Sequence, residues 1–152
     1  MKRGLLFVLA VALSGCPGEP PGPEIEPLFP EDYASRWTEV RDCRLSVEHT
    51  LVHVRVWANP IALGAYERRD APFPDGSVLL KEEFADSRCT DRSGWTVMAR
   101  EAGFAPMYGD WHWQDVLPDR RVVSDGTVST CFQCHEDCGV APDGHDWTCA
   151  VP

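Results

Sequence analysis

Lysine and long hydrophobic runs are scarce in this chain of 152 residues. Its only lysines are Lys2 and Lys81, and acidic residues outnumber basic ones by 24 to 14, which gives a formal net charge of −10. This charge argues against binding to nucleic acid or to anionic lipid by electrostatic attraction. No internal apolar run reaches the roughly 20 residues that a transmembrane helix needs. We therefore expect one globular domain, without repeats or an internal membrane span.

The N-terminus has the organisation of an export signal. Met1–Arg3 is basic, and Gly4–Leu13 is an apolar stretch of signal-peptide length. The segment Leu13-Ser14-Gly15-Cys16 resembles the lipobox of bacterial lipoproteins, in which the cysteine is acylated and becomes the first mature residue. The alternative is ordinary secretion, with Cys16 as a plain thiol. We expect residues 1–15 to be a lipoprotein signal peptide that leaves the protein lipid-anchored on the periplasmic face of a bacterial membrane.

Proline dominates the segment that follows. Residues 17–30 contain six prolines, which cannot form a helix interior or a central strand. Such a segment is typical of a stiff, extended spacer. We expect residues 16–29 to be a proline-rich tether and residues 30–152 to form the folded domain.

Within that domain, short segments with strand or helix periodicity alternate with turn-forming residues. The expected strands are residues 51–58, 77–84, 95–100 and 111–117, with a last extended piece that ends at Asp125-Gly126. The expected helices begin at Pro30-Glu31-Asp32 (with Tyr33, Trp37 and Val40 at helical spacing), after Asn59-Pro60, and after Thr127 as a cap. This pattern predicts the α+β class, with an antiparallel β-sheet and flanking helices.

The segment Cys131-Phe132-Gln133-Cys134-His135 carries the strongest chemical signal. Its spacing lets both thiols reach the two vinyl groups of one haem, while the adjacent imidazole binds the iron. A zinc site completed by Cys138, Cys149 or His145 is one alternative. A thioredoxin-like redox pair is another, although no βαβ pattern surrounds the motif. We predict one covalently attached haem c, with His135 as an axial iron ligand.

The motif does not decide the second axial position of the iron. A histidine or methionine there would give a low-spin electron carrier, and an empty position would leave the iron reactive. Each residue of these types also has an ordinary explanation, as core or as a hydrogen-bonded side chain. The candidates by residue type are His49, His53, Met98, Met107, His112 and His145.

Seven cysteines allow a partial assignment of disulfides. If Cys16 carries lipid and two cysteines bind haem, four remain, and an even number in an oxidising compartment suggests two disulfides. Cys138 and Cys149 share a segment rich in turn formers, which favours their pairing and leaves Cys43 with Cys89. Connectivity does not follow from sequence alone, and free buried thiols are the alternative.

Lys81 lies directly after Val78, Leu79 and Leu80 in an expected strand. A lysine in such surroundings costs free energy unless its amine reaches water or a partner. The simplest explanation is a lysine on an edge strand, where it blocks aggregation.

Residues 73–82, Phe-Pro-Asp-Gly-Ser-Val-Leu-Leu-Lys-Glu, resemble the signature segment of the cytochrome P-460 family. The resemblance covers about residues 30–136 in the same order. Its other parts are Pro-Glu-Asp-Tyr at 30–33, Val-Trp-Ala-Asn-Pro at 56–60, Gly-Asp-Trp at 109–111 and the C-terminal Cys-x-x-Cys-His. It implies a homodimeric sheet protein, like the related beta-type cytochromes c-prime, with a five-coordinate haem and a vacant distal site.

The resemblance also implies two possible functions. In the enzyme branch a lysine, matched here by Lys81, is bonded to the porphyrin edge, and the enzyme oxidises hydroxylamine. The c-prime branch lacks the cross-link and binds nitric oxide and similar gases. The enzyme branch has a distal carboxylate just before its Gly-x-Trp stretch, where this chain has no acid; Glu101, Asp110 or Asp115 are the candidates to replace it. We therefore expect a small nitrogenous ligand or substrate and a redox partner protein, and we leave enzyme, gas-binding protein and electron carrier open.

Overall fold

A six-stranded antiparallel sheet forms the domain, and each strand pairs with the next one along the chain. The computed structural model describes residues 24–47, 49, 51–139 and 144–149, so the predicted signal peptide and lipobox lie outside the described residues. The strands are β1 (Thr38–Ser46), β2 (Val52–Ala58), β3 (Val78–Phe84), β4 (Arg92–Arg100), β5 (Trp111–Val116) and β6 (Val122–Gly126). The helices are α1 (Tyr33–Arg36), α2 (Pro60–Arg68), α3 (Ser129–His135) and the 3-10 turns η1 (Pro106–Tyr108) and η2 (Glu136–Cys138). The expected α+β architecture is confirmed.

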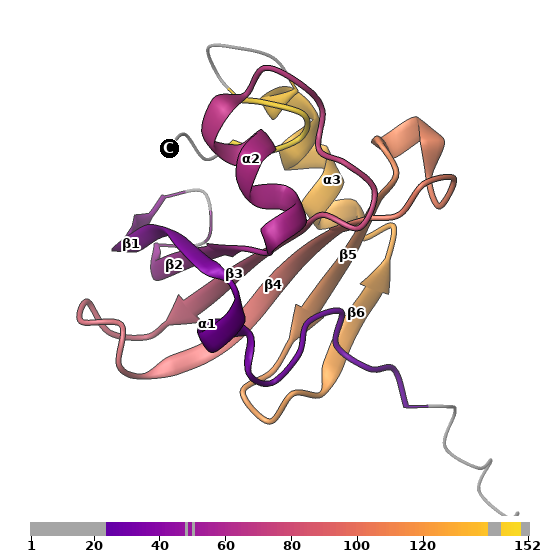
Figure 1. Cartoon of the computed structure of the whole chain (residues 1–152). Coiled ribbons are helices and arrows are strands. Elements are labelled where there is room, and N and C mark those ends of the chain that lie inside the picture. Colours follow the sequence, from indigo (N-terminus) through magenta and orange to yellow (C-terminus); the bar gives the residue numbers. More distant parts are fainter. Residues whose placement is uncertain (1–23, 48, 50, 140–143, 150–152) are drawn as a thin grey trace, which may run out of the picture.

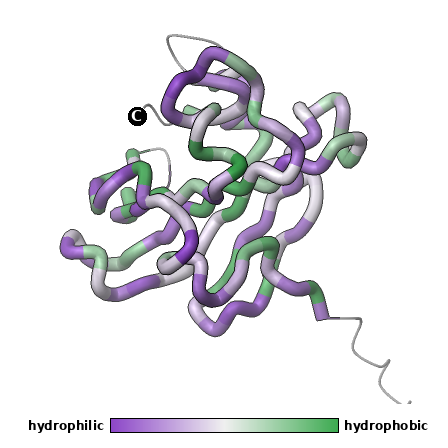
Figure 2. Tube along the Cα trace, in the orientation of Figure 1, coloured by the Kyte–Doolittle hydropathy of each residue, from purple (hydrophilic) through white to green (hydrophobic). Residues whose placement is uncertain are grey.

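The sheet is covered on both faces (Figure 1). Helices α2 and α3 cover one face, here called the α3 face, and α1 with the segment before it covers the other, the α1 face. Hydrophobic positions concentrate between α2 and the sheet, while the outer loops are hydrophilic (Figure 2). Among the described residues, no helix is long and apolar enough to cross a membrane.

Each strand alternates between the two faces, and this alternation positions the site. In β3, Leu79 packs in the α3-face core and Leu80 in the α1-face core. Lys81 therefore projects to the α3 face and Glu82 to the α1 face. The predicted alternation of β2 is confirmed in the same way, since Arg55 and Trp57 both contact Glu82.

Two local expectations at the N-terminal end of the domain are wrong. The first helix ends at Arg36, because Trp37 is extended (φ −110°, ψ 164°), and Val40 lies in β1 rather than on a helix. Strand β1 was not expected, because it is an edge strand whose bulges break the two-residue period that marks a strand.

The helix caps give one success and one failure. Asn59 caps α2 as predicted, its side chain accepting a hydrogen bond from the Ala62 N–H at 2.9 Å. Thr127 does not cap α3: the N-cap residue is Val128, and no side chain caps that end.

Two disulfides fasten segments around the sheet. Cys43 in β1 is bonded to Cys89 in the turn between β3 and β4, with a Cα–Cα distance of 5.9 Å. Cys138 is bonded to Cys149, with a Cα–Cα distance of 4.8 Å. The second disulfide ties the C-terminal segment, which includes Trp147, to the end of α3.

Candidate functional site

Helix α3 presents the Cys-x-x-Cys-His motif over the sheet. Cys131 is half-buried against the α3-face core, Cys134 is exposed, and neither forms a disulfide. Residues three apart on a helix lie on the same side, so both thiols are available to one ligand. The ring of Phe132 contacts that of Tyr108 in η1, with centroids 4.2 Å apart, which helps to hold the helix in place.

His135 has the form of an iron ligand. Its Nδ1 lies 2.6 Å from the carbonyl oxygen of Trp147, and because a carbonyl only accepts, Nδ1 carries the proton and Nε2 the lone pair. Among the described residues, no hydrogen bond engages Nε2. Burial lowers the pKa of His135 to about 4, with smaller effects in the same direction from Lys81 and His49, so the imidazole is neutral at neutral pH. A neutral imidazole fixed through its other nitrogen is the arrangement that metal-binding histidines adopt.

Opposite α3, five side chains form one row across the α3 face of the sheet. They occupy directly paired positions on neighbouring strands, and paired residues share a face. In order from β1 to β5, this Lys81 row consists of Arg41, Val56, Lys81, Thr96 and Asp115. Asp115 and Lys81 both lie within electrostatic range of the Cys131 thiol, whose pKa is raised chiefly by burial.

The structure overturns the edge-strand explanation of Lys81. Strand β3 is an interior strand, between β2 and β4, and Lys81 is half-buried. Its Nζ lies 2.6 Å from Nε2 of His49, and Nδ1 of His49 lies 3.5 Å from Oε1 of Glu83. The ring of His49 also lies edge-on to that of His135, with centroids 6.3 Å apart and an interplanar angle of 83°. The amine of Lys81 therefore lies on the same side of the sheet as the predicted iron ligand.

The three candidate carboxylates lie in different places. Glu101 binds Nδ1 of His112 at 3.0 Å, and Asp110 accepts a hydrogen bond from the Ala105 N–H at 3.1 Å. Asp115 is the one in the Lys81 row. Burial raises the pKa of Asp115, and the charge of Glu83 raises it further. Its environment and position suit a group that accepts or donates protons at the site.

The candidates for the sixth iron ligand also lie in different parts of the domain. His53 and His112 project to the α1 face, because Val54 and Trp113 beside them in sequence project to the α3 face. His145 binds the Ala71 carbonyl through Nε2 at 2.9 Å. Met98 is a core residue, and Met107 is 85% exposed. His49 is the candidate whose ring contacts that of His135.

The zinc alternative loses two of its ligands. Cys138 and Cys149 are joined in a disulfide, so neither offers a thiolate to a metal ion. His145 is occupied by its hydrogen bond to Ala71.

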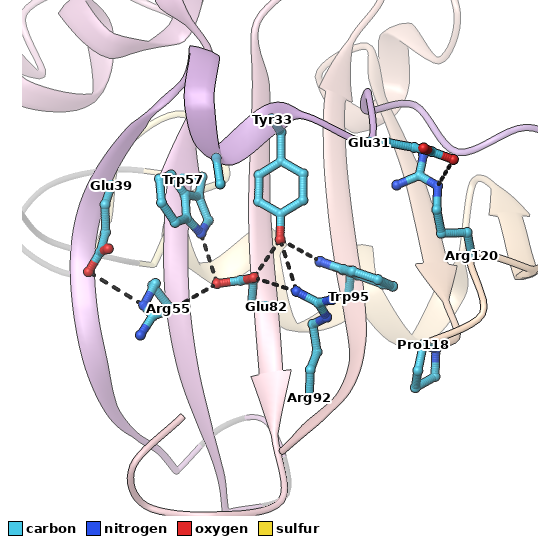
Figure 3. A pocket seen from close by; sticks show the side chains of 11 residues that line it. Glu31, Tyr33, Glu39, Arg55, Trp57, Glu82, Arg92, Trp95, Pro118 and Arg120 are labelled. Carbon is cyan, nitrogen blue, oxygen red and sulfur yellow. Dashed lines mark hydrogen bonds and ion pairs between the residues drawn. The ribbon is translucent and has the colours of Figure 1, made fainter. Parts of the chain in front are cut away.

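The α1 face holds a separate cavity of about 690 Å³ (Figure 3). At its centre is Glu82, whose side chain is only 4% exposed and accepts hydrogen bonds from Tyr33, Arg55, Trp57 and Arg92. Burial and the bond to Glu82 raise the pKa of Tyr33 to about 12. Sequence reasoning missed this cluster, although the alternation Leu80, Glu82, Phe84 placed an acid among inward-facing residues. Because it lies on the face away from α3, it is not part of the site that carries the cysteines.

Comparison with known families decides the broader assignment. The family model described as Cytochrome P460 matches residues 30–142. The chain belongs to the cytochrome P460 family. The matched span contains Lys81, Cys131, Cys134 and His135, so the resemblance seen in the sequence is confirmed. No curated protein sequence matches the chain. Membership of the cytochrome P460 family identifies the chain as a haem-binding cytochrome.

Proposed function

We propose that this cytochrome P460 carries one haem c, bonded to Cys131 and Cys134, with His135 as the axial ligand and the opposite iron face vacant. We propose that it carries out redox chemistry on a small nitrogen compound of the hydroxylamine or nitric oxide type. The observation that carries the proposal is the state of His135: neutral, held through Nδ1 by the Trp147 carbonyl, with Nε2 unbonded among the described residues. It stands beside two thiols that form no disulfide.

The residues present fit such a group. When bound, the haem supplies an iron that binds a small ligand and takes up electrons. The protein's own contribution lies in the Lys81 row, which faces α3 across the site. Asp115, with its raised pKa, is placed to accept protons released by a substrate such as hydroxylamine. Lys81 and His49 add two further nitrogen groups that can orient a ligand by hydrogen bonds.

A specific observation favours one alternative. The ring of His49 lies 6.3 Å from that of His135, and a histidine on each side of the iron would make a low-spin electron carrier. The other alternative is nitric oxide or gas binding without turnover, which shares the vacant site and differs in lacking catalysis and the Lys81 cross-link.

Visible spectra distinguish a vacant site from an occupied one. We expect the ferric and ferrous holoprotein to show the spectra of a five-coordinate, high-spin haem, and added nitric oxide to change the Soret band at once. A six-coordinate low-spin spectrum without added ligand would contradict the vacant site. In that case His49→Ala should restore a high-spin spectrum if His49 is the sixth ligand, and leave it unchanged if it is not.

We further propose that Lys81 is bonded to the porphyrin edge, which supports the enzyme rather than the gas-binding function. An interior strand limits the rotamers of Lys81 and fixes its direction, as covalent attachment to a held ring requires. Peptide mass spectrometry of the holoprotein should show the Lys81 peptide joined to the haem peptide of Cys131 and Cys134. Lys81→Arg should separate the two peptides and shift the Soret band to shorter wavelength. An unmodified Lys81 peptide in full yield from the wild type would favour gas binding.

For localisation, we propose periplasmic exposure and a lipid anchor on Cys16, since residues 13–16 resemble a lipobox. The mature protein should partition with membranes, and Cys16→Ser should leave it soluble or unprocessed, because the multiple acyl chains provide the attachment. Fractionation followed by immunoblotting measures this. Retention of correctly cleaved Cys16→Ser protein in the membrane would contradict the anchor.

We also propose a homodimer and electron transfer to a partner protein, on the resemblance to this family. Light scattering of the purified holoprotein measures the first, and a monomer at all concentrations would refute it. Reoxidation of the ferrous protein by candidate acceptor proteins measures the second, and failure with every acceptor tried would contradict it.

A further inference from the structure

Several buried polar atoms above the α3 face lack a hydrogen-bond partner among the described residues, including Nε1 of Trp111 and of Trp113, and two others belong to neighbouring side chains. These two are the hydroxyl of Tyr66, a residue only 3% exposed on α2, and Nε of Arg41 in β1, and neither makes a hydrogen bond of standard geometry among the described residues. Leaving such a group unpaired costs about 1–3 kcal/mol. Unpaired groups in native structures therefore often mark the place of a molecule that completes them.

The surroundings of these atoms are cationic. Burial raises the pKa of Tyr66, while the charges of Arg41, Arg69 and Arg44 and a hydrogen-bonding contact with the Arg41 side chain lower it. All three guanidinium groups therefore lie within electrostatic range of the phenol. Arg44 pairs with Asp42, and Arg69 donates to the Thr148 carbonyl. For Arg41, no ion pair is formed with any carboxylate that the structure describes. A phenol hydroxyl beside an uncompensated guanidinium is a site for an anion, and above all for a carboxylate.

The Lys81 row shows where Arg41 lies relative to the cysteines that would hold the haem. Asp115 at the β5 end lies within electrostatic range of Cys131, and Arg41 occupies the β1 end. Neighbouring strands are about 4.8 Å apart, so Arg41 lies about 10 Å beyond Lys81 on the side opposite Asp115. Haem has two vinyl groups on one edge and two propionates on the opposite edge. Thioether bonds at Cys131 and Cys134 would hold the vinyl edge over strands β3 to β5, since Cys131 lies within electrostatic range of both Lys81 and Asp115. The opposite, propionate edge would then extend toward β1 and α2.

We propose that Arg41 and Tyr66 bind the haem propionates. This inference rests on the proposed covalent haem and adds a function for two residues outside the Cys-x-x-Cys-His motif. Arg41 supplies a charged, directional donor, and the Tyr66 hydroxyl donates a second hydrogen bond to the same group. Both unpaired atoms gain a partner when the haem is present. The positive charge of Arg41 beside the propionates also makes the ferric state less favourable, since it repels the added positive charge of the oxidised iron.

The test uses holoprotein carrying Arg41→Gln or Tyr66→Phe, with Arg68→Gln as the matched control, because Arg68 is an exposed arginine on the same helix as Tyr66. A haem stain on a denaturing gel first verifies covalent attachment in each variant. We expect the propionate bending band in the resonance Raman spectrum to shift in both test variants and to stay in place in the control. Spectroelectrochemistry should show a lower midpoint potential for Arg41→Gln, and Arg41→Lys, which keeps the charge, should restore most of it.

Unchanged Raman bands and potentials in variants that retain covalent haem would overturn the proposal while leaving the proposed function intact. Loss of covalent haem from the wild type would overturn both. If Arg41→Gln fails to fold, Tyr66→Phe still decides, because it removes a single oxygen atom that makes no hydrogen bond of standard geometry with any described residue. A crystal structure of the wild-type holoprotein gives a further decision: a propionate oxygen within about 3.5 Å of either side chain supports the proposal, and propionates directed away from both refute it.

Discussion

Replacing both Cys131 and Cys134 by alanine yields a protein without covalent haem. These two thiols are the cysteines that no disulfide engages among the described residues, and they lie one helical turn apart beside His135. The variant also loses stability, because the haem is a large apolar group and the cavity left by its absence costs free energy in proportion to its volume. The haem stain on a denaturing gel should fall to background, and soluble protein should decrease.

The same chain offers a matched control. Cys43→Ala with Cys89→Ala also removes two cysteines and opens the disulfide between β1 and the β3–β4 turn. We expect this control to lose about 2–5 kcal/mol of stability and to keep its haem stain in whatever protein remains folded. A stain of equal strength in the Cys131→Ala, Cys134→Ala variant would mean that these residues do not hold the haem.

Replacement of Glu82 by glutamine destabilises the domain without affecting haem attachment. The Glu82 carboxylate joins Tyr33 in α1 to Arg55 in β2 and Arg92 in β4 (Figure 3). A glutamine of the same shape leaves Arg92 without a carboxylate among the described residues, leaves Arg55 only its pair with Glu39, and turns an amide N–H toward another donor. Loss of one partner of a buried ion pair costs about 3–5 kcal/mol. Because both arginines are partly exposed, we expect the lower end, about 3 kcal/mol, measured as a lower midpoint of urea unfolding.

Asp70→Asn serves as the control for this measurement. It breaks the pair between Arg68 and Asp70, whose side chains are 63% and 60% exposed, and such pairs contribute at most about 1 kcal/mol. If Glu82→Gln costs no more than Asp70→Asn, the cluster on the α1 face does not stabilise the fold.

The sequence predicted those parts of the fold that local chemistry decides. The alternation in β2 and the Asn59-Pro60 start of α2 depend on neighbouring residues, and both are found. The spacing of the cysteine motif likewise needs only a few residues to be recognised. Strand β1 was missed because its register with β2 shifts at residues 39–41 and 41–44. These bulges break the alternation of polar and apolar residues by which a strand is recognised in a sequence.

Predicting which residues form the site requires the pairing of the strands, which the sequence does not give. Glu101, Asp110 and Asp115 were equivalent candidates in the sequence, and only strand register shows that Asp115 shares a row with Lys81. The order of the strands in the sheet makes β3 an interior strand, which removes the edge-strand explanation of Lys81. The pairing of Arg41 with Val56 is likewise invisible in the sequence, because β1 was not expected.

The mass of the intact mature protein, measured after denaturation and removal of free haem, tests the covalent attachment most directly. Our account predicts the mass of the processed chain plus one haem, with the haem located by digestion on the peptide that contains Cys131 and Cys134. A mass equal to that of the processed chain alone, with all the haem recovered in the fraction of free haem, would contradict covalent attachment.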